Sequence, residues 1–341
     1  MRWIPAWRSE SDMALLQIEQ LQVHFRTPTG VVRSVNGLTL DVNAGETVAI
    51  VGESGCGKSV TSMAILRLVP TPPGRMAGRI FFEGRDLMAV SEDDMRQVRG
   101  NEISVIFQEP MTSLNPVLTI GDQIAETLKL HQGLTTAQAQ ERALEMLRLV
   151  GLTAPERRLH EYPHQLSGGM CQRVMIAIAL ACKPKLLIAD EPTTALDVTV
   201  QAQILDLMRD LQKRLGTAIM LITHDLGVVA QSAHRVIVMY AGRKVEEAAV
   251  SELFARPLHP YTRGLLGAVP KLGSSLTHAE RTPLAEIEGS VPDLRKPLVG
   301  CAFASRCAKA DDVCLRSTPA LREDGAGHWV ACHHVNTEVQ A

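Results

Sequence analysis

The sequence lacks features that would indicate a membrane span or a nucleic-acid surface. Its 35 basic and 37 acidic residues are mixed along the chain, with no long run of either sign, and leave a formal net charge of −2. This balance argues against a strongly charged surface for nucleic acid or membrane lipid. The longest uninterrupted apolar stretch near the centre, Val174 to Cys182, is far shorter than the ~20 residues that a membrane-crossing helix needs.

A secretory signal is also missing, because residues 1–8 carry charge but no apolar segment of sufficient length. We therefore expect a cytoplasmic protein, in a compartment where disulfides are rare. With 341 residues and 45% hydrophobic content, the chain can build a full core in one large domain or two. Met13 precedes the first strand-like segment, so residues 1–12 are either an extension or a misassigned start.

Residues 52–59 read Gly-Glu-Ser-Gly-Cys-Gly-Lys-Ser and match the phosphate-loop pattern G-x-x-x-x-G-K-[ST] without departure. The apolar run from Thr47 to Val51 indicates a buried strand before the loop, and helix-forming residues follow from Val60 to Val69. Glycines let the backbone approach an anion closely, and a helix N-terminus offers unpaired N–H donors. We expect Lys58 to reach the outer phosphates of a nucleotide and Ser59 to hold Mg²⁺ through its hydroxyl.

An ordinary glycine turn that matches by accident is the alternative to this phosphate loop. From average residue frequencies, four fixed positions would match somewhere in a chain this long roughly one time in a hundred. The strand before the loop and the helix after it reduce that chance further. Nucleotide binding is therefore the working hypothesis.

Two strands are predicted ahead of the phosphate loop, at Leu15 to Phe25 and at Val31 to Val42, on either side of a turn at residues 27–30. Phe25 ends the first strand. Its ring face could stack on a purine, although a lone phenylalanine in a strand is more often part of the core.

A polar loop from Gln108 to Pro116 follows two further predicted strands, at residues 78–83 and 103–107. Its two prolines argue against regular structure. The Gln108 side chain can accept from water and coordinate a metal through its carbonyl oxygen, whereas by itself it would be a solvent-facing polar residue. From about Thr119 to Tyr162 the apolar spacing becomes helical and predicts a helical insertion.

Ser167, Gly168 and Gly169 open the next predicted helix, whose body runs from Cys171 to Cys182. A serine and two glycines at a helix start can form a second anion site, built like the first. Without other information, an N-cap serine with a flexible turn would be the simpler interpretation.

Two adjacent carboxylates, Asp190 and Glu191, end the strand predicted at residues 186–189. This position suits Mg²⁺ binding by Asp190 and water activation by Glu191. His224 follows the strand predicted at residues 218–222, which we expect beside the carboxylate strand. We predict that His224 contacts the terminal phosphate, although a single histidine is usually structural.

Together these motifs resemble the ATP-binding subunit of an ABC transporter, over about residues 14–270. The Walker A loop, Q-loop, signature motif, Walker B strand with its catalytic carboxylate, D-loop and switch histidine occur in the family's order, at residues 52–59, Gln108, 166–170, 186–191, 195–197 and His224. Phe25 is similar to the adenine-stacking aromatic of the A-loop. The resemblance implies an α/β P-loop NTPase of the ABC ATPase type, with a RecA-like core, an antiparallel β subdomain and an α-helical subdomain at about residues 119–183.

The resemblance also implies residue roles. ATP contacts would fall on Phe25, Gly52, Ser54, Gly55, Cys56, Gly57, Lys58, Ser59, Val60, Ser167, Gly168 and Gly169. Mg²⁺ would be held by Ser59, Gln108 and Asp190. In a head-to-tail dimer, the signature loop of one subunit would cover ATP on the Walker A loop of the other. Catalysis would rest on Glu191, His224 and Gln108, with Glu191 polarising the attacking water.

Residues 108–116 and 259–262 are similar to the ATPase subunits of dipeptide, oligopeptide and nickel importers, and the tail from Pro297 to His333 favours peptides. The resemblance implies import through two separate membrane permease subunits, with a second ATPase subunit of different sequence, a peptide-binding protein, and a peripheral place at the cytoplasmic face of the inner membrane. A nickel importer is an alternative. A soluble ABC ATPase of translation or DNA repair is disfavoured, because such proteins usually carry two cassettes or a long coiled-coil insertion.

Seven cysteines divide into two groups by position. Cys56, Cys171 and Cys182 lie in or beside predicted helical and loop elements, and we interpret them as small packing residues. The other four gather in the tail, at Cys301, Cys307, Cys314 and Cys332.

Four clustered thiols in a cytoplasmic chain favour a metal site over disulfides. Their spacings are too wide for the C-x2-C pairs of a usual zinc ribbon, whereas an iron–sulfur cluster accepts more varied spacings. The tail also resembles the C-terminal region of peptide-importer ATPases. We hypothesise a structural [4Fe-4S] cluster on these four residues, with zinc or free thiols as alternatives. The predicted domains are an N-terminal extension (1–13), an ABC ATPase domain (14–270) and a small cysteine-rich C-terminal extension (271–341).

Overall fold

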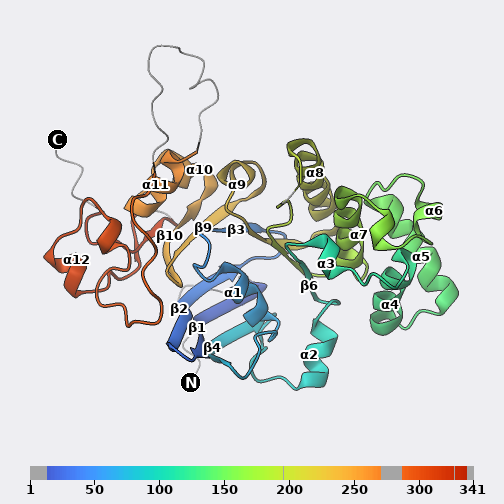
Figure 1. The fold of residues 1–341 in the computed structure, drawn as a ribbon, viewed down its shortest axis with the longest axis horizontal. Helices are drawn as coiled ribbons and strands as arrows, with labels where there is room; N and C mark the ends of the chain where they lie inside the picture. Colours follow the sequence, from blue (N-terminus) through green and yellow to red (C-terminus); the bar gives the residue numbers. More distant parts are fainter. Residues whose placement is uncertain (1–13, 195, 270–285, 326, 336–341) are drawn as a thin grey trace, which may run out of the picture. The chain divides into compact units, whose positions relative to one another are not determined.

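The chain divides into two units in the computed structural model, which describes residues 14–194, 196–269, 286–325 and 327–335 (Figure 1). The first unit holds residues up to 17 together with 41–47 and 80–222, and the second holds 18–40, 48–79 and the described residues from 223 onward. The predicted N-terminal extension, Ala195 of the D-loop and residues 271–285 lie outside the described residues.

The first unit is built around three parallel strands, β6 (Ile103–Ile106), β7 (Leu186–Asp190) and β8 (Ala218–Ile222). β7 lies in the middle, and its last residue, Asp190, pairs with Ile222 of β8. Every residue of β7 and β8 is buried, as expected for continuous apolar runs in a parallel sheet. The prediction that residues 218–222 lie beside the carboxylate strand is confirmed.

Helices form most of the rest of the first unit, and α4, α5 and α7 pack against one another (Figure 1). Threonines cap α4 and α5, and the αL residue Gly133 ends α4. The predicted helical insertion is thereby confirmed. The helices and the short strand of this unit are β5 (Arg85–Asp86), α2 (Glu92–Val98), α3 (Pro110–Ser113), α4 (Ile120–Gln132), α5 (Thr136–Leu149), α6 (Pro155–Arg158), η2 (Pro163–Gln165), α7 (Gly168–Leu180) and α8 (Val198–Leu215).

Two predicted local structures are wrong. The loop after Gln108 contains a helical turn, α3, because Pro110 occupies its first position, where a helix needs no backbone N–H donor. The helix after the phosphate loop, α1 (Lys58–Ile65), ends before the predicted Val69, since Arg67 adopts a left-handed conformation with a φ of 53°.

The second unit contains a sheet in which β9 (Arg235–Tyr240) runs parallel to β3 (Thr47–Val51) and antiparallel to β10 (Arg243–Ala249). The hairpin between β9 and β10 turns at Ala241 and Gly242, which both have positive φ, and it confirms the predicted turn. The sheet continues from β10 into two short strands of the C-terminal tail, β12 (Trp329–Val330) and β11 (Arg322–Glu323).

The neighbouring strands β2, β1 and β4 form a sheet whose residues lie mainly in the second unit. The two predicted N-terminal strands are confirmed, and β4 begins four residues before the predicted Gly78. The strands and remaining helices are β1 (Leu16–Thr27), β2 (Gly30–Val42), β4 (Gly74–Phe82), α9 (Leu226–Ser232), α10 (Val250–Ala255), α11 (Pro260–Gly267), η3 (Ala304–Arg306) and α12 (Asp312–Arg316).

The C-terminal tail shares a hydrophobic core with the strands of the second unit. The ring of Phe303 meets Tyr240 edge-on, with centroids 5.2 Å apart, and lies 5.5 Å from Tyr261. All three rings are at most 4% exposed. The tail is therefore anchored in this core, and its description as a separate extension stays a prediction. None of the helices among the described residues combines the length and apolarity that a membrane crossing requires.

Candidate functional site

The phosphate loop joins β3 to α1 and depends on glycine at two tight positions. Gly52 has a φ of 152°, and a Cβ there would lie 2.2 Å from the carbonyl oxygen of Met239. Gly57 has a φ of 102°, and a Cβ there would lie 2.3 Å from the carbonyl oxygen of Ser34. Any other residue at either position would have to displace backbone, so the loop conformation requires glycine.

Lys58 begins α1 and is only 6% exposed. Its ammonium donates to the carbonyl oxygens of Gly52, at 2.7 Å, and Glu53, at 3.1 Å. Ser59 is exposed in the first turn of the helix, while Cys56 is buried, and burial raises the pKa of its thiol. The loop thus presents a cation and a hydroxyl at a helix N-terminus, which is the donor set that a polyphosphate needs.

Asp190 and Glu191 lie where β7 ends. Asp190 is 8% exposed, and Glu191 is half-buried with a φ of 48°, an uncommon left-handed conformation for a residue with a side chain. The Glu191 N–H still donates to the carbonyl oxygen of Ile222, at 2.8 Å. The backbone therefore turns sharply at Glu191 while remaining tied to the neighbouring strand.

The side chains of Gln108 and Thr194 hold the Glu191 carboxylate. The Gln108 amide donates to its Oε2 at 3.0 Å, and the Thr194 hydroxyl donates to the same oxygen at 2.9 Å. The structure thus brings together two of the three predicted catalytic residues, Gln108 and Glu191. Thr194 was missed, because a threonine three residues after a carboxylate carries no sequence signal of its own.

The predicted signature turn lies at the start of α7. Ser167 is the N-cap and accepts from the N–H of Met170 at 3.4 Å. Ser167 and Gly168 are exposed, and a Cβ at Gly168 would meet nothing within 4 Å. Gly169 is more confined, since a Cβ there would lie 2.8 Å from Val200.

The other predicted nucleotide contacts lie in the second unit. Ser54 and Gly55 are exposed in the phosphate loop, and Val60 is half-buried in α1. Phe25 is half-buried near the end of β1. His224 is exposed immediately after β8. Contact of these residues with nucleotide stays a prediction.

The four tail cysteines line one small cavity, together with His333 and His334. All seven cysteines of the chain are described and are free thiols. Burial raises the pKa of the Cys301, Cys314 and Cys332 thiols, and for Cys301 the other three tail thiols raise it further. The described residues also place ligating atoms of Asp311, Cys314 and His334 within 4.8 Å of one another.

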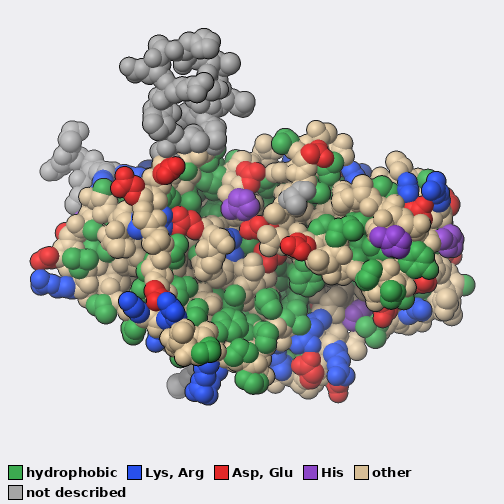
Figure 2. Space-filling view, viewed as in Figure 1, with side chains coloured by type: hydrophobic (Ala, Val, Ile, Leu, Met, Phe, Trp, Pro, Cys, Tyr) green, Lys and Arg blue, Asp and Glu red, His purple; other side chains and the backbone are tan. Residues whose placement is uncertain are grey.

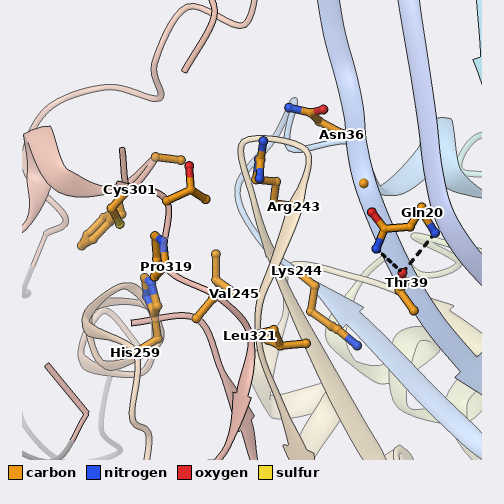
Figure 3. Close-up of a pocket in the computed structure, with 15 residues that line it drawn as sticks. Gln20, Asn36, Thr39, Arg243, Lys244, Val245, His259, Cys301, Pro319 and Leu321 are labelled. Carbon is orange, nitrogen blue, oxygen red and sulfur yellow. Dashed lines mark hydrogen bonds between the residues drawn. The ribbon is translucent and has the colours of Figure 1, made fainter. Parts of the chain in front are cut away.

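A second cavity, of about 250 Å³, is lined in part by residues of the C-terminal tail (Figure 3). Gln20 and Thr39, which are hydrogen-bonded at 3.0 and 3.1 Å, face it from β1 and β2. Arg243 of β10 and the tail residue Cys301 also line it. Of the predicted site residues that the structure describes, Cys301 alone reaches this cavity, so it is separate from the nucleotide motifs.

Two family profiles match separate regions of the sequence. The profile described as ABC transporter matches residues 35–194, and the profile described as the oligopeptide/dipeptide transporter C-terminal region matches residues 245–314.

Relatives match over nearly the whole length. A Sinorhizobium fredii protein described as a probable peptide ABC transporter ATP-binding protein is 56% identical, over 95% of this chain and 96% of its own. An oligopeptide transport ATP-binding protein of Bacillus subtilis is 52% identical, over 93% and 96%, and a dipeptide transport ATP-binding protein of the same organism is 51% identical, over 93% and 94%.

A solved structure, described as the dimeric, post-hydrolysis state of an ATP-binding cassette bound to ADP and Pi, is similar with a TM-score of 0.62. It is 28% identical and covers 69% of this chain and 98% of its own. By these relationships the chain is an ABC-type ATPase, and it belongs to the oligopeptide/dipeptide branch of the ABC transporter ATP-binding subunits.

Proposed function

We propose that this ATPase energises the import of di- or oligopeptides through a separate membrane permease. The observation that carries the proposal is the presence of both family regions in one chain that is 56% identical to a probable peptide transporter subunit. The relatives described above bear peptide-transport names, which favours peptides over the nickel alternative. A peripheral position at the cytoplasmic face of the membrane follows from this role.

ATP hydrolysis would use the residues at the two glycine turns and the carboxylate strand. Lys58 and the amides of the phosphate loop would bind the phosphates, and Phe25 would stack on adenine. Glu191 would orient and deprotonate the attacking water as general base, and His224 would contact the terminal phosphate. The Gln108–Glu191 contact supports this assignment, because it joins two of the residues predicted to act in catalysis.

Mg²⁺ would be held by Ser59, Gln108 and Asp190. Their hydroxyl, amide and carboxylate oxygens are the hard ligands that this ion prefers. When bound, the ion neutralises charge on the phosphates.

A second ATPase subunit, often a different chain in this family, would complete the site. The exposed Ser167–Gly168 turn at the start of α7 supports a contact made across a dimer, and a similar cassette is described as dimeric. In that dimer the signature turn of each subunit would cover ATP bound to the phosphate loop of the other.

The permease would dock near α3. Phe107, Met111 and Val117 flank or belong to this turn and are 46%, 49% and 75% exposed. Figure 2 shows further apolar side chains on the surface over the helices α4 to α7. Apolar exposure next to Gln108 supports a coupling contact that links nucleotide state to the permease.

Reconstitution in vesicles tests the transport proposal. The chain, its partner ATPase, the two permease subunits and the peptide-binding protein are combined, and ATP-dependent uptake of labelled dipeptide, oligopeptide and Ni²⁺ is measured. Peptide uptake that Lys58→Ala abolishes is expected. Uptake of Ni²⁺ without peptide would reassign the solute, and ATP hydrolysis without any coupled uptake would contradict the transport role.

The four tail thiols would hold a [4Fe-4S] cluster with a structural role. All four converge on one cavity, and thiolates are the ligands of such clusters. The Asp311–Cys314–His334 group offers one oxygen, one sulfur and one nitrogen ligand, whereas the four thiols that line the cavity offer the all-sulfur set that a [4Fe-4S] cluster takes. When bound, the cluster would cross-link the tail.

Iron and acid-labile sulfide assays on anaerobically purified protein test the cluster. Four irons and four sulfides per chain are expected for this cluster type, with loss of both in Cys301→Ser and retention in the packing control Cys182→Ser. Zinc without iron would overturn the assignment.

A further inference from the structure

The second residue of the phosphate loop, Glu53, is held by the C-terminal part of the chain. Its backbone N–H donates to the hydroxyl of Tyr261 at 2.8 Å. Its carboxylate receives both terminal nitrogens of Arg306, with Nη1 to Oε2 at 2.6 Å and Nη2 to Oε1 at 3.0 Å. Bidentate arginine–carboxylate pairs of this kind fix geometry as well as charge.

The guanidinium of Arg306 is itself immobilised. The side chain is 4% exposed, and it donates to the carbonyl oxygens of Ile287, at 2.8 Å, and Glu288, at 2.9 Å. Its central carbon lies 5.8 Å from the Tyr240 ring and 5.9 Å from the Phe303 ring. Because these contacts fix the Arg306 guanidinium, the ion pair with Arg306 also fixes the Glu53 carboxylate.

The segment that Tyr261 and Arg306 hold is also the segment that Lys58, the cation of the phosphate loop, contacts. Lys58 donates to the carbonyl oxygens of Gly52 and Glu53, so the position of the Gly52–Glu53 peptides sets where its ammonium rests. The Glu53 N–H bonds to Tyr261 and its carboxylate to Arg306. A shift of Glu53 would therefore move Lys58 relative to an incoming triphosphate.

We infer that Arg306 is a positioning residue for ATP binding: through Glu53 it holds the phosphate loop in a form that accepts ATP, and so makes the cysteine-rich segment a determinant of nucleotide affinity. Arg306 ends η3, which lies between Cys301 and Cys307, two residues of the four-thiol cavity. The inference rests on the proposed use of this loop for ATP.

Equilibrium binding of a fluorescent N-methylanthraniloyl ATP to the full-length chain, with Mg²⁺, tests the inference. Arg306→Gln and Glu53→Gln are each expected to weaken binding by about tenfold, and the double variant is expected to bind no more weakly than either. Unchanged affinity in the single variants, tighter binding by Glu53→Gln, or fully additive losses would overturn the inference.

Arg316→Gln is the matched control, because Arg316 lies in the tail helix α12, is 79% exposed and pairs with Asp312 one turn earlier in the same helix. Its affinity for ATP is expected to equal that of the wild type. If the wild type and Arg316→Gln both fail to bind ATP, the proposed function fails. If both bind and Arg306→Gln binds equally well, only the inference fails.

Two further measurements separate positioning from folding. In the assembled complex, Arg306→Gln is expected to raise KM for ATP while kcat at saturating ATP stays within about twofold, because chemistry itself is untouched. Arg306→Lys keeps the charge but loses the fork and is expected to be intermediate. Should Arg306→Gln not fold, judged by thermal unfolding without nucleotide, Glu53→Gln and Arg306→Lys still decide the outcome.

Discussion

The chain carries two glycine turns at helix N-termini, and they differ in how they are supported. In the phosphate loop, Gly52 and Gly57 are wedged against backbone carbonyls and Lys58 is buried. In the signature turn, Ser167 and Gly168 are exposed, and Gly168 has open space where a side chain would begin. The phosphate loop is thus closely packed by its own chain, whereas the signature turn lies exposed on the surface. The difference agrees with the proposal that the first turn binds ATP within its own chain and that the second acts on ATP bound by a neighbouring subunit.

Removing the proposed general base, Glu191, should separate ATP binding from ATP hydrolysis. Glu191→Gln is expected to lower turnover by roughly 10²-fold or more, because the amide cannot accept the proton, while ATP binding is retained. ATPase rate and nucleotide binding of the assembled complex measure the two effects. Glu145→Gln, the same change at a carboxylate on α5, is the control, and equal turnover of wild type and Glu191→Gln would refute the role of Glu191.

Adding a side chain at Gly57 should distort the phosphate loop. Gly57→Ala places a carbon 2.3 Å from the Ser34 carbonyl oxygen, and the resulting shift is expected to weaken ATP binding by about 10²-fold. Gly133→Ala is the control, since Gly133 also has a positive φ, of 64°, but a Cβ there would meet nothing within 4 Å, and it lies at the end of α4. Titration with labelled ATP distinguishes them, and full affinity in Gly57→Ala would show that the loop adapts.

Adding a negative charge to the signature turn should leave ATP binding by the isolated chain unchanged. Gly168→Asp adds a carboxylate in open space, so ATP binding by the chain alone is expected to remain unchanged. In the dimer the same carboxylate would oppose the triphosphate, and turnover is expected to fall by about tenfold or more. Gly168→Asn has a similar shape without the charge and should lose much less. A complex that is indifferent to Gly168→Asp would place this turn outside the nucleotide site.

The last prediction concerns folding stability and tests the support behind the phosphate loop. Tyr261→Phe removes the hydroxyl that accepts from the Glu53 N–H and leaves that donor without its partner. A loss of about 1–3 kcal/mol in the free energy of unfolding is expected. Chemical denaturation measures it, with Tyr162→Phe, at a more exposed tyrosine, as the control. A loss no greater than that of the control would mean that water replaces the hydroxyl.

The sequence predicted those features that are local. The strand, phosphate loop and helix start were recognisable because the pattern is continuous, and the two adjacent carboxylates followed from a short apolar strand. Pro110 was misjudged because the same residue that breaks a helix interior also suits a helix start. Helix ends such as that of α1 depend on single backbone conformations that composition does not reveal.

Contacts between distant residues could not be predicted from one sequence. Arg306 lies 253 positions after Glu53, and neither residue type is unusual at its place. The buried carboxylate of Glu246, which accepts from the N–H groups of Leu258 and His259 and pairs with His328, was missed for the same reason. Burial by itself raises the pKa of Glu246, but the hydrogen bonds that its carboxylate accepts together lower it. Such pairs form only after the fold has brought distant segments of the chain together.

The short strand β12 covers one edge of β10. It occupies the hydrogen-bonding side of β10 that would otherwise terminate the sheet of the second unit. A protein shortened before Arg322 would present the backbone of β10 at an open border, and such borders recruit strands from other molecules. We therefore expect a protein truncated in this way to self-associate more readily than the full-length chain.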